Sequence, residues 1–349
     1  MSYGRVLGGA LQDYAWGRPD GLQPWTGLRT GGPEAELWFG THPAAPSPTV
    51  RSLPEGAPHR GDAPLLVKIL AAAKPLSIQL HPSHVAMAQL EDRGHAGLLV
   101  DRGEKAELLI AVERFEALAG LRALPEARAV VRALRLDDAA DLLDRGDVRG
   151  AIAELLSTDA VPDFDAGLAA LPPIERTILA KARAAFPGDR GLPVAFLMQP
   201  HVLEPGDALS VPVGVVHAYV DGLAVEVMTS CDNVLRLGMT SKLVSVEAAL
   251  LAINPGRGPE RMPGLAVSGR YDSPLMPFVV ERMDGGSAPI GPGVIALALE
   301  GELTVSSALG TLEARAGQAV YVEQDASWTL AAHGVAFVAT PRVPNPCGD

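Results

Sequence analysis

Two segments in the first third of the chain carry polar side chains at a spacing that suits metal binding. In LSIQLHP (residues 76–82), polar and apolar residues alternate, so a strand would place Gln79 and His81 on one face. In EKAELLIAV (residues 104–112), the same alternation places Lys105 and Glu107 on one face. Each pattern alone also fits an ordinary half-exposed strand. Together they offer an amide oxygen, an imidazole and a carboxylate, all of which are metal ligands.

A third segment, GDALSVPVGVVH (residues 206–217), has the spacing G(X)5PXG(X)2H through Gly206, Pro212, Gly214 and His217. The proline ends a strand, the glycine permits a tight turn, and the histidine returns toward the interior on the next strand. This spacing resembles the second signature of the cupin superfamily. We therefore expect His217 to join the candidate ligands of the first two segments.

The four candidate ligands, Gln79, His81, Glu107 and His217, predict one Zn²⁺ ion. Two imidazoles, one neutral amide oxygen and one carboxylate suit a metal of intermediate softness, and Mn²⁺, Fe²⁺ or Co²⁺ fit less well. With one anionic ligand, the site would keep a net positive charge of about one and its Lewis acidity. The chain's two cysteines, Cys231 and Cys347, lie outside these segments, which argues against a thiolate-rich structural zinc site.

The elements that must position these residues follow the order β, then α, then β. Residues 1–112 are rich in Gly, Pro and short apolar runs, which predicts strands and turns. From Phe115 to Phe186 the pattern becomes helical, with four helices expected in residues 127–136, 137–146, 148–157 and 174–186. Strand patterns return after residue 191. This order predicts a mainly β core that carries a helical insertion.

A weak internal repeat supports two related β halves. GDALSVPVGVVH (residues 206–217) aligns with GQAVYVEQDASW (residues 317–328) at an offset of 111 residues, which places Trp328 where the first copy has His217. The second half would therefore lack the metal ligand.

Composition restricts the partners and the location of the chain. A net charge of −12 over 349 residues would repel nucleic acid and anionic membranes, although a small anion could still bind in a local cationic pocket. No apolar run approaches the roughly 18 residues of a membrane span. The N-terminus lacks the pattern of a secretory signal, and two cysteines do not form a disulfide framework. We therefore expect a cytoplasmic protein.

Longer segments resemble the type I mannose-6-phosphate isomerase family, also called phosphomannose isomerase. They are YAWG (14–17), AELWFGTHP (35–43), LLVKILAAAKPLSIQLHP (65–82), EKAELLIAVERFEALAGLR (104–122) and LEPGDALSVPVGVVHAYVDGLAVEVMTSCDNVLRLGMTSK (203–242). The resemblance implies a zinc enzyme with a double cupin fold, that is, jelly-roll β-sandwiches with an α-helical insertion domain. It implies a catalytic cupin domain in residues 1–112 plus 191–255, a helical insertion in 113–190, and a C-terminal cupin-like domain without metal ligands in 256–349.

The resemblance also implies the roles of site residues. The zinc ligands of the family fall on the same four residues, Gln79, His81, Glu107 and His217. The remaining site residues fall into a catalytic group and a substrate-binding group: Arg236, Glu226, Lys105 and Tyr219 in the first, and Ser77, Lys242, Lys68 and Trp16 in the second. The family's usual His-Lys-Pro-Glu-Met is here Glu104 to Leu108, with Ala106 for the proline, and Ser83 replaces an acid.

The implied reaction interconverts mannose 6-phosphate and fructose 6-phosphate through a cis-enediol. It needs a base for the proton that moves between C2 and C1, a group that stabilises the developing oxyanion, and a phosphate anchor. Glu226 and Lys105 are both candidates for the base, and the sequence does not decide between them. Arg236 and Lys242 could hold the phosphate or the enediolate, with Ser77 as an added donor.

Two alternatives remain at this point. A catalytically silent relative could bind a sugar phosphate as a sensor or partner module, which the changes at Glu104 and Ala106 allow. A metal-dependent cupin oxygenase would require an open iron site rich in histidine, and Gln79 argues against that. The sequence does not indicate the oligomeric state or the preferred sugar epimer.

Overall fold

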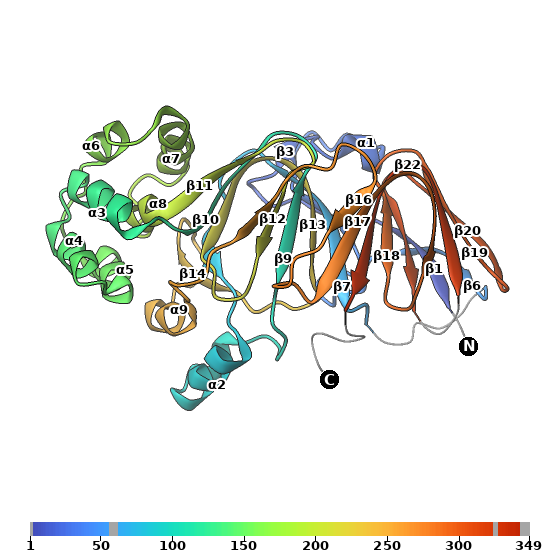
Figure 1. The fold of residues 1–349 in the computed structure, drawn as a ribbon, viewed down its shortest axis with the longest axis horizontal. Coiled ribbons are helices and arrows are strands. Elements are labelled where there is room, and N and C mark those ends of the chain that lie inside the picture. Colours follow the sequence, from blue (N-terminus) through green and yellow to red (C-terminus); the bar gives the residue numbers. More distant parts are fainter. Residues whose placement is uncertain (1–2, 56–61, 324–326, 343–349) are drawn as a thin grey trace.

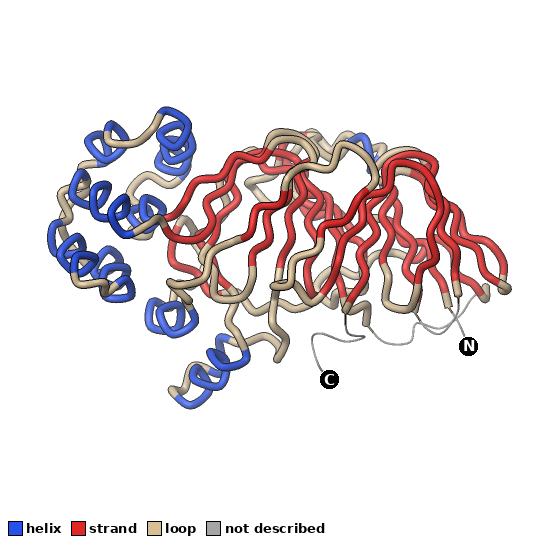
Figure 2. The backbone as a smooth tube through the Cα atoms, in the orientation of Figure 1, coloured by secondary structure: helices blue, strands red, loops and turns tan. Residues whose placement is uncertain are grey.

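The computed structural model describes residues 3–55, 62–323 and 327–342, and antiparallel β-sheets are its main regular structure (Figures 1 and 2). Helices gather at one end, beyond the edge of the sheets, as Figure 2 shows. The prediction of a mainly β chain with a helical insertion is confirmed.

One large sheet carries the residues of the predicted site. Its strand order is β15 (Glu260–Met262), β12 (Ala208–Val211), β9 (Glu107–Ala111), β13 (His217–Thr229), β7 (Leu65–Ala72), β5 (Glu36–Phe39) and β2 (Ala10–Gln12). Beside this path, β10 (Phe115–Leu121) pairs with β11 (Met198–Leu203) and β13, and β8 (Ile78–Leu80) pairs with β13 and β14 (Leu235–Gly238). The long strand β13 therefore connects nearly every segment that the sequence singled out.

The second large sheet is built mainly from the C-terminal third of the chain. Its order is β16 (Gly269–Tyr271), β17 (Phe278–Ile290), β22 (Trp328–Pro341), β18 (Ile295–Ala298), β21 (Gln318–Val322), β1 (Gly4–Gly8) and β6 (Thr49–Leu53), while β19 (Glu302–Ser307) pairs with β22 and β20 (Gly310–Arg315). A small pair, β3 (Arg18–Pro19) and β4 (Pro33–Glu34), lies apart from both sheets.

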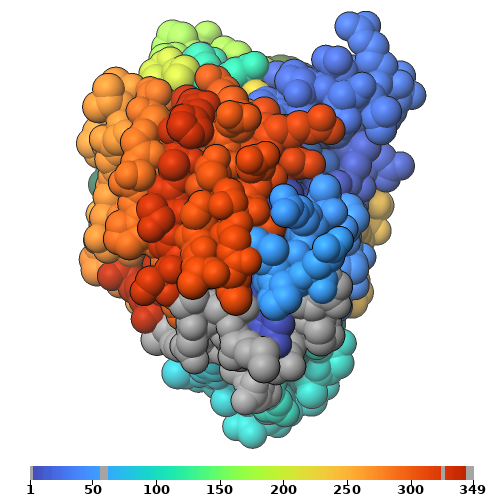
Figure 3. Space-filling view, turned by 90° about the vertical axis from the view of Figure 1, so that its right-hand side faces the viewer, coloured from blue at the N-terminus to red at the C-terminus, as the bar shows by residue number. Residues whose placement is uncertain are grey.

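The N-terminal strands β1 and β6 complete this C-terminal sheet, because β1 pairs along its whole length with β21. Figure 3 shows the light-blue atoms of the N-terminal region against the orange atoms of the C-terminal region. The sequence did not predict that N-terminal strands would belong to the C-terminal sheet. The predicted division into three domains stays a prediction. These two strands lie in its catalytic domain, within residues 1–112, but belong to the sheet of its C-terminal domain, residues 256–349.

Helices occupy most of residues 124–197. They are α3 (Leu124–Ala133), α4 (Asp137–Asp144), α5 (Val148–Ser157), α6 (Phe164–Ala169), α7 (Pro173–Ala185) and α8 (Leu192–Leu197). The four expected helices are present, and α6 and α8 were not predicted. In α7 the apolar residues Ile178, Leu179 and Ala182 are buried at helical spacing, so packing of this face stabilises the helix.

Residues 115–121 form strand β10, whereas the sequence pattern predicted helix from Phe115 onward. The strand lies between β11 and β13, and all but its last residue are buried. Pairing on both edges satisfies its backbone groups, and this tertiary context overrides the helix propensity of Ala117 and Ala119.

Short helices connect the remaining elements: α1 (Gln23–Thr26), α2 (His84–Asp92), the 3-10 helix η1 (Ala96–Leu98) and α9 (Val246–Ala252). Among the described residues, no helix is long and apolar enough to cross a membrane.

The two copies of the sequence repeat occupy matching places in the two sheets. In the first copy, β12 leads through a turn into β13, which begins at His217; in the second, β21 precedes β22, which begins at Trp328. In the first turn, Gly214 has φ +80°, and a Cβ there would lie 3.0 Å from the Asn254 Cβ and 3.2 Å from the Ala252 carbonyl oxygen. The glycine of the signature therefore meets two constraints, a left-handed backbone and little space.

We predict that Gly214→Ala destabilises the protein by about 1–3 kcal/mol, because the left-handed conformation is strained for alanine and the turn has no room for its Cβ. Urea unfolding measures the change. Gly188→Ala is the matched control, because Gly188 has φ +78° but nothing within 4 Å of a Cβ, so it should cost less. Equal costs at both positions would show that the space around Gly214 has no effect.

Candidate metal centre and active site

Three of the four predicted metal ligands meet in the interior. His81 directly follows β8, Glu107 begins β9 and His217 begins β13, and their exposed fractions are 0%, 1% and 0%. His81 Nε2 lies 3.1 Å from Glu107 Oε1, and His217 Nε2 lies 3.2 Å from Glu107 Oε2. One ligand atom from each residue fits within 4.8 Å of the others, which is close enough for one ion.

The hydrogen bonds of the two histidines fix which ring nitrogen faces the centre. His81 Nδ1 lies 2.8 Å from the Asn233 carbonyl oxygen, and His217 Nδ1 lies 3.1 Å from the Val215 carbonyl oxygen. A carbonyl oxygen only accepts, so each Nδ1 carries a proton and each Nε2 faces Glu107. This second contact is the usual support of a metal-binding histidine.

The charge state of this group favours a bound cation. Burial, followed by the nearby Lys105 ammonium, lowers the pKa of His81 to about 4, so the imidazole is neutral at pH 7. A neutral His81 with its proton on Nδ1 directs a lone pair at the carboxylate 3.1 Å away, and two acceptors at this distance repel each other. The donor set therefore fits a divalent metal ion, which would remove this repulsion.

Gln79 lies in a row of directly opposed residues next to this group. Strand β8 pairs Gln79 with His217 of β13 on one side and with Arg236 of β14 on the other. Directly opposed residues in a sheet point to the same face, so the pairing brings the amide of Gln79 beside the imidazole of His217. This placement agrees with the predicted ligand role, which stays a prediction.

A second row of opposed residues forms an ion-pair network. Strands β5, β7 and β13 place Trp38, Lys68 and Glu226 side by side. Lys68 Nζ lies 2.8 Å from Glu226 Oε2, 3.7 Å from Glu36 Oε1 and 5.0 Å from the centre of the Trp38 ring. Burial alone would lower the pKa of Lys68, but the two carboxylates outweigh it and raise the pKa, so this lysine stays charged.

A β-bulge in β13 lets one strand serve both rows. Glu116 of β10 pairs with Asp221 and the next residue, Ala117, pairs with Tyr219, so one extra residue interrupts the register. The bulge reverses the alternation, and Tyr219 and Glu226 both line the pocket although an odd number of positions separates them. Bulges of this kind often re-aim side chains near active sites.

Two further groups contact Glu107. Lys105 Nζ lies 2.9 Å from Glu107 Oε1, and the Tyr219 hydroxyl donates to Glu107 Oε2 at 3.1 Å. Burial would raise the pKa of Glu107, but the Lys105 ammonium outweighs it and holds this pKa well below its usual range. Burial and Glu107 raise the pKa of Tyr219, so its hydroxyl stays protonated and remains a donor.

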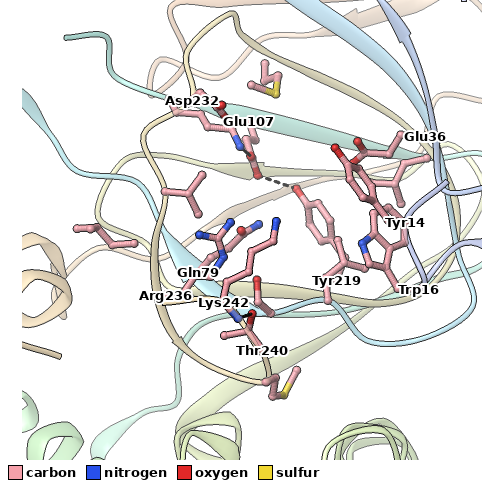
Figure 4. Close-up of a pocket in the computed structure, with 18 of the residues that line it drawn as sticks. Tyr14, Trp16, Glu36, Gln79, Glu107, Tyr219, Asp232, Arg236, Thr240 and Lys242 are labelled. Atoms are coloured by element: carbon pink, nitrogen blue, oxygen red, sulfur yellow. Dashed lines mark hydrogen bonds and ion pairs between the residues drawn. The ribbon is translucent and has the colours of Figure 1, made fainter. Parts of the chain in front are cut away.

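A pocket of about 860 Å³ opens above the centre, and ten of the twelve predicted site residues line it (Figure 4). They are Trp16, Lys68, Ser77, Gln79, Lys105, Glu107, Tyr219, Glu226, Arg236 and Lys242. The other two, His81 and His217, lie beneath it in contact with Glu107. In Figure 4, Arg236 and Lys242 approach from one side and Trp16 with Tyr14 from the other.

Several lining residues were not selected from the sequence. Tyr14 stacks on Trp16 with ring centres 5.7 Å apart, and Glu36 and Trp38 support Lys68. His42, expected to be structural, also lines the pocket and packs edge-on against Trp38. The segment AELWFGTHP held the signal for Glu36 and Trp38, because both would lie on one face of a strand with period two.

The chain was compared with known families and curated proteins. Residues 6–124 match the family model described as phosphomannose isomerase type I, catalytic domain. Mannose-6-phosphate isomerase 1 of Arabidopsis thaliana is 28% identical, over 84% of this chain and 81% of its own length. Mannose-6-phosphate isomerase of Escherichia coli is also 28% identical, over 68% of this chain and 71% of its own length.

Solved structures show the same fold. A point mutant of phosphomannose isomerase from Salmonella typhimurium has a TM-score of 0.81 at 22% identity, covering 98% of this chain and 100% of that chain. A zinc-bound mannose 6-phosphate isomerase has a TM-score of 0.77 at 23% identity, with the same coverage. The predicted double cupin fold is thereby confirmed. Residues 6–124 thus resemble the catalytic domain of type I phosphomannose isomerases, and curated mannose-6-phosphate isomerases are similar to two thirds or more of the chain.

Proposed function

We propose that the chain is a zinc-dependent isomerase that interconverts mannose 6-phosphate and fructose 6-phosphate. The observation that carries this proposal is the position of the His81–Glu107–His217 group beneath a pocket that also holds the cations Arg236 and Lys242. An aldose-ketose isomerase needs both parts, one for the reacting oxygens and one for the phosphate. The names of the curated relatives agree with this substrate.

Zinc fits the donor set better than a harder cation. Two imidazole nitrogens and one carboxylate are typical zinc ligands, and the zinc-bound relative with the same fold supports this choice. We assign the fourth ligand to Gln79. When bound, zinc supplies Lewis acidity at the substrate oxygens O1 and O2, whose carbons C1 and C2 change oxidation state between aldose and ketose.

The phosphate is assigned to Arg236, Lys242 and Ser77. Arg236 is half-buried and its Nε has no hydrogen-bond partner, so this donor is available to a ligand. Burial lowers the pKa of Arg236, but a guanidinium stays charged at neutral pH. Lys242 lies on the exposed loop after β14 and adds a second charge. Trp16 lies on the opposite wall, where its ring can pack against the sugar.

The proton transfer is assigned to Glu226 and Lys105, which act together as an acid/base relay. A base removes the proton from C2 of the aldose and returns it to C1 of the ketose, while the proton of the O1 or O2 hydroxyl moves to the other oxygen. Burial raises the pKa of Glu226, although Lys68 opposes this. The pKa is therefore closer to that of an effective base at neutral pH. Lys68 holds Glu226 in place through its 2.8 Å contact.

Tyr219 has a positioning role. Its hydroxyl donates to Glu107 Oε2, and so it holds the carboxylate toward the two histidines. Its ring packs edge-on against Phe115 of β10, which fixes the direction of the hydroxyl.

The remaining partners follow from charge. The net charge of −12 disfavours nucleic acid and anionic membranes, so a small sugar phosphate is the expected partner. We also propose a cytoplasmic location, on the composition of the chain. Cys347, one of the two cysteines in that argument, lies outside the described residues.

A coupled assay with both sugar phosphates tests the proposal. We expect turnover in both directions, loss of activity on chelation and recovery with Zn²⁺. His217→Ala or His81→Ala should lower bound zinc, measured by atomic absorption, well below one per chain, because each removes one buried ligand. Gln79→Ala and Glu107→Ala should act in the same direction.

His201→Ala serves as the matched control. His201 is a partly buried histidine that bonds the Ala119 carbonyl oxygen outside the pocket, and its loss should leave zinc content and turnover unchanged. Full turnover by a metal-free His217→Ala protein would refute the zinc assignment. Saturable binding of the sugar phosphate without turnover in the wild type would identify a sensor module instead.

The role of Glu226 predicts a pH profile. Its pKa is raised, and a base must be ionised, so kcat/KM should fall as the pH falls through a value above the ordinary glutamate range. Glu226→Gln should lower kcat by about 10²–10⁴ and remove this acid limb from the profile.

Glu116→Gln is the control for loss of a buried, ion-paired carboxylate. Glu116 contacts Arg114 and Lys181 at 2.7 Å each, and it is not a lining residue of the pocket. Its loss should leave the pH profile unchanged. If Glu226→Gln keeps the same acid limb, the base is another group, with Lys105 as the first alternative.

A further inference from the structure

Asp189 connects the helical insertion to the loop that carries Lys242. It lies between α7 and α8, and its half-buried carboxylate accepts three backbone hydrogen bonds. One comes from Gly191 at 2.8 Å within its own turn. The other two come from across the gap, from Met239 at 2.9 Å and Thr240 at 3.3 Å, which directly follow β14.

The loop needs this support, because its backbone is strained at the point of contact. Met239 has φ +52°, a left-handed conformation that is rare for a residue with a side chain. The carboxylate accepts from the amide of this same residue. A negative charge that receives backbone N–H groups makes a stronger hydrogen bond than a neutral acceptor, so Asp189 stabilises a conformation that the loop alone would not favour.

The turn of Asp189 and the end of β14 also pack so closely that position 191 has no room for a side chain. A Cβ on Gly191 would lie 2.3 Å from the Leu237 carbonyl oxygen and 2.4 Å from the Gly238 Cα. This contact places the start of the loop directly against the turn that holds Asp189. The insertion also reaches the pocket, because Ala185 and Phe186 at the end of α7 line it.

A short series of contacts continues from Asp189 to Lys242. The carboxylate holds the amide of Thr240, and the Thr240 hydroxyl accepts from the amide of Lys242 at 3.0 Å. Residues 239–243 and Ser245 all line the pocket, and Figure 4 shows Thr240, Lys242 and Arg236 on the same side. Ser241 and Lys242 are exposed, so few packing contacts are available to order them.

We propose that Asp189 is a positioning residue for the phosphate site: it fixes the loop backbone so that Lys242 and Arg236 face the pocket together. This inference rests on the proposed function, since it assumes that these two cations bind the phosphate of the substrate. It gives the helical insertion a part in substrate binding.

The test compares binding with turnover. Asp189→Ala should raise KM for mannose 6-phosphate about tenfold and raise the Ki of inorganic phosphate by a similar factor, with kcat changed less than about twofold. A misplaced phosphate anchor weakens substrate and transition state alike, which gives this pattern. Asp189→Asn keeps one oxygen that can accept from Gly191 and Met239, so it should restore part of the loss.

Asp147→Ala is the matched control, because Asp147 also accepts a backbone hydrogen bond in the insertion, from Gly150 at 2.8 Å, far from the pocket lining. It should lower the unfolding temperature without changing KM or Ki. The inference is overturned if a folded Asp189→Ala protein keeps both constants, or if Asp147→Ala changes them equally. A wild type without turnover would refute the proposed function, and calorimetric titration with inorganic phosphate would still test Asp189.

Discussion

The buried carboxylate of Glu107 is the charge on which the arrangement of the site depends. An anion inside a protein is costly unless opposite charges and hydrogen-bond donors replace water around it. Lys105 Nζ and the Tyr219 hydroxyl meet part of this requirement at 2.9 Å and 3.1 Å from its two oxygens. The Nε2 atoms of His81 and His217 lie 3.1 Å and 3.2 Å away, where a shared cation would complete it. Because these side chains come from separate segments, the sheet must bring those segments to one point.

The register of the sheet performs this task. One row of opposed residues places Gln79 between His217 and Arg236, and another places Lys68 between Trp38 and Glu226. A single strand, β13, belongs to both rows, and its bulge is what allows both to face the same pocket. The second row also carries compensating charges, so the two buried carboxylates nearest Lys68 are satisfied without the metal.

The candidate metal ligands His81, Glu107 and His217, which meet in the structure, are predictable from the sequence because their signal is local. Alternation within LSIQLHP and EKAELLIAV, and the glycine-histidine spacing of residues 206–217, depend only on strand geometry. The contacts that sequence reasoning missed depend on pairing between distant segments. Four such features leave no local pattern in the sequence. They are the bulge near Val220, the strand at Phe115–Leu121, the N-terminal strand in the C-terminal sheet and the contact of Asp189 with Met239.

The C-terminal sheet has a matching strand order in which tryptophan replaces the candidate ligand His217. Trp328 begins β22 as His217 begins β13, but its ring is fully buried in an apolar cluster with residues such as Val305, Leu312 and Leu330. Indole has no lone pair to offer a metal, and its large ring fills space that an imidazole would leave open. The two sheets thus share a strand order but differ in what this strand encloses. In the C-terminal sheet, Trp328 is stabilised by apolar burial. In the sheet that contains β13, the interior carries charges that depend on a precise register. Strands β1 and β6 pair within the C-terminal sheet, and β2 and β5, which lie between them in the sequence, belong to the sheet that carries the candidate site, so the N-terminal segment joins the two sheets.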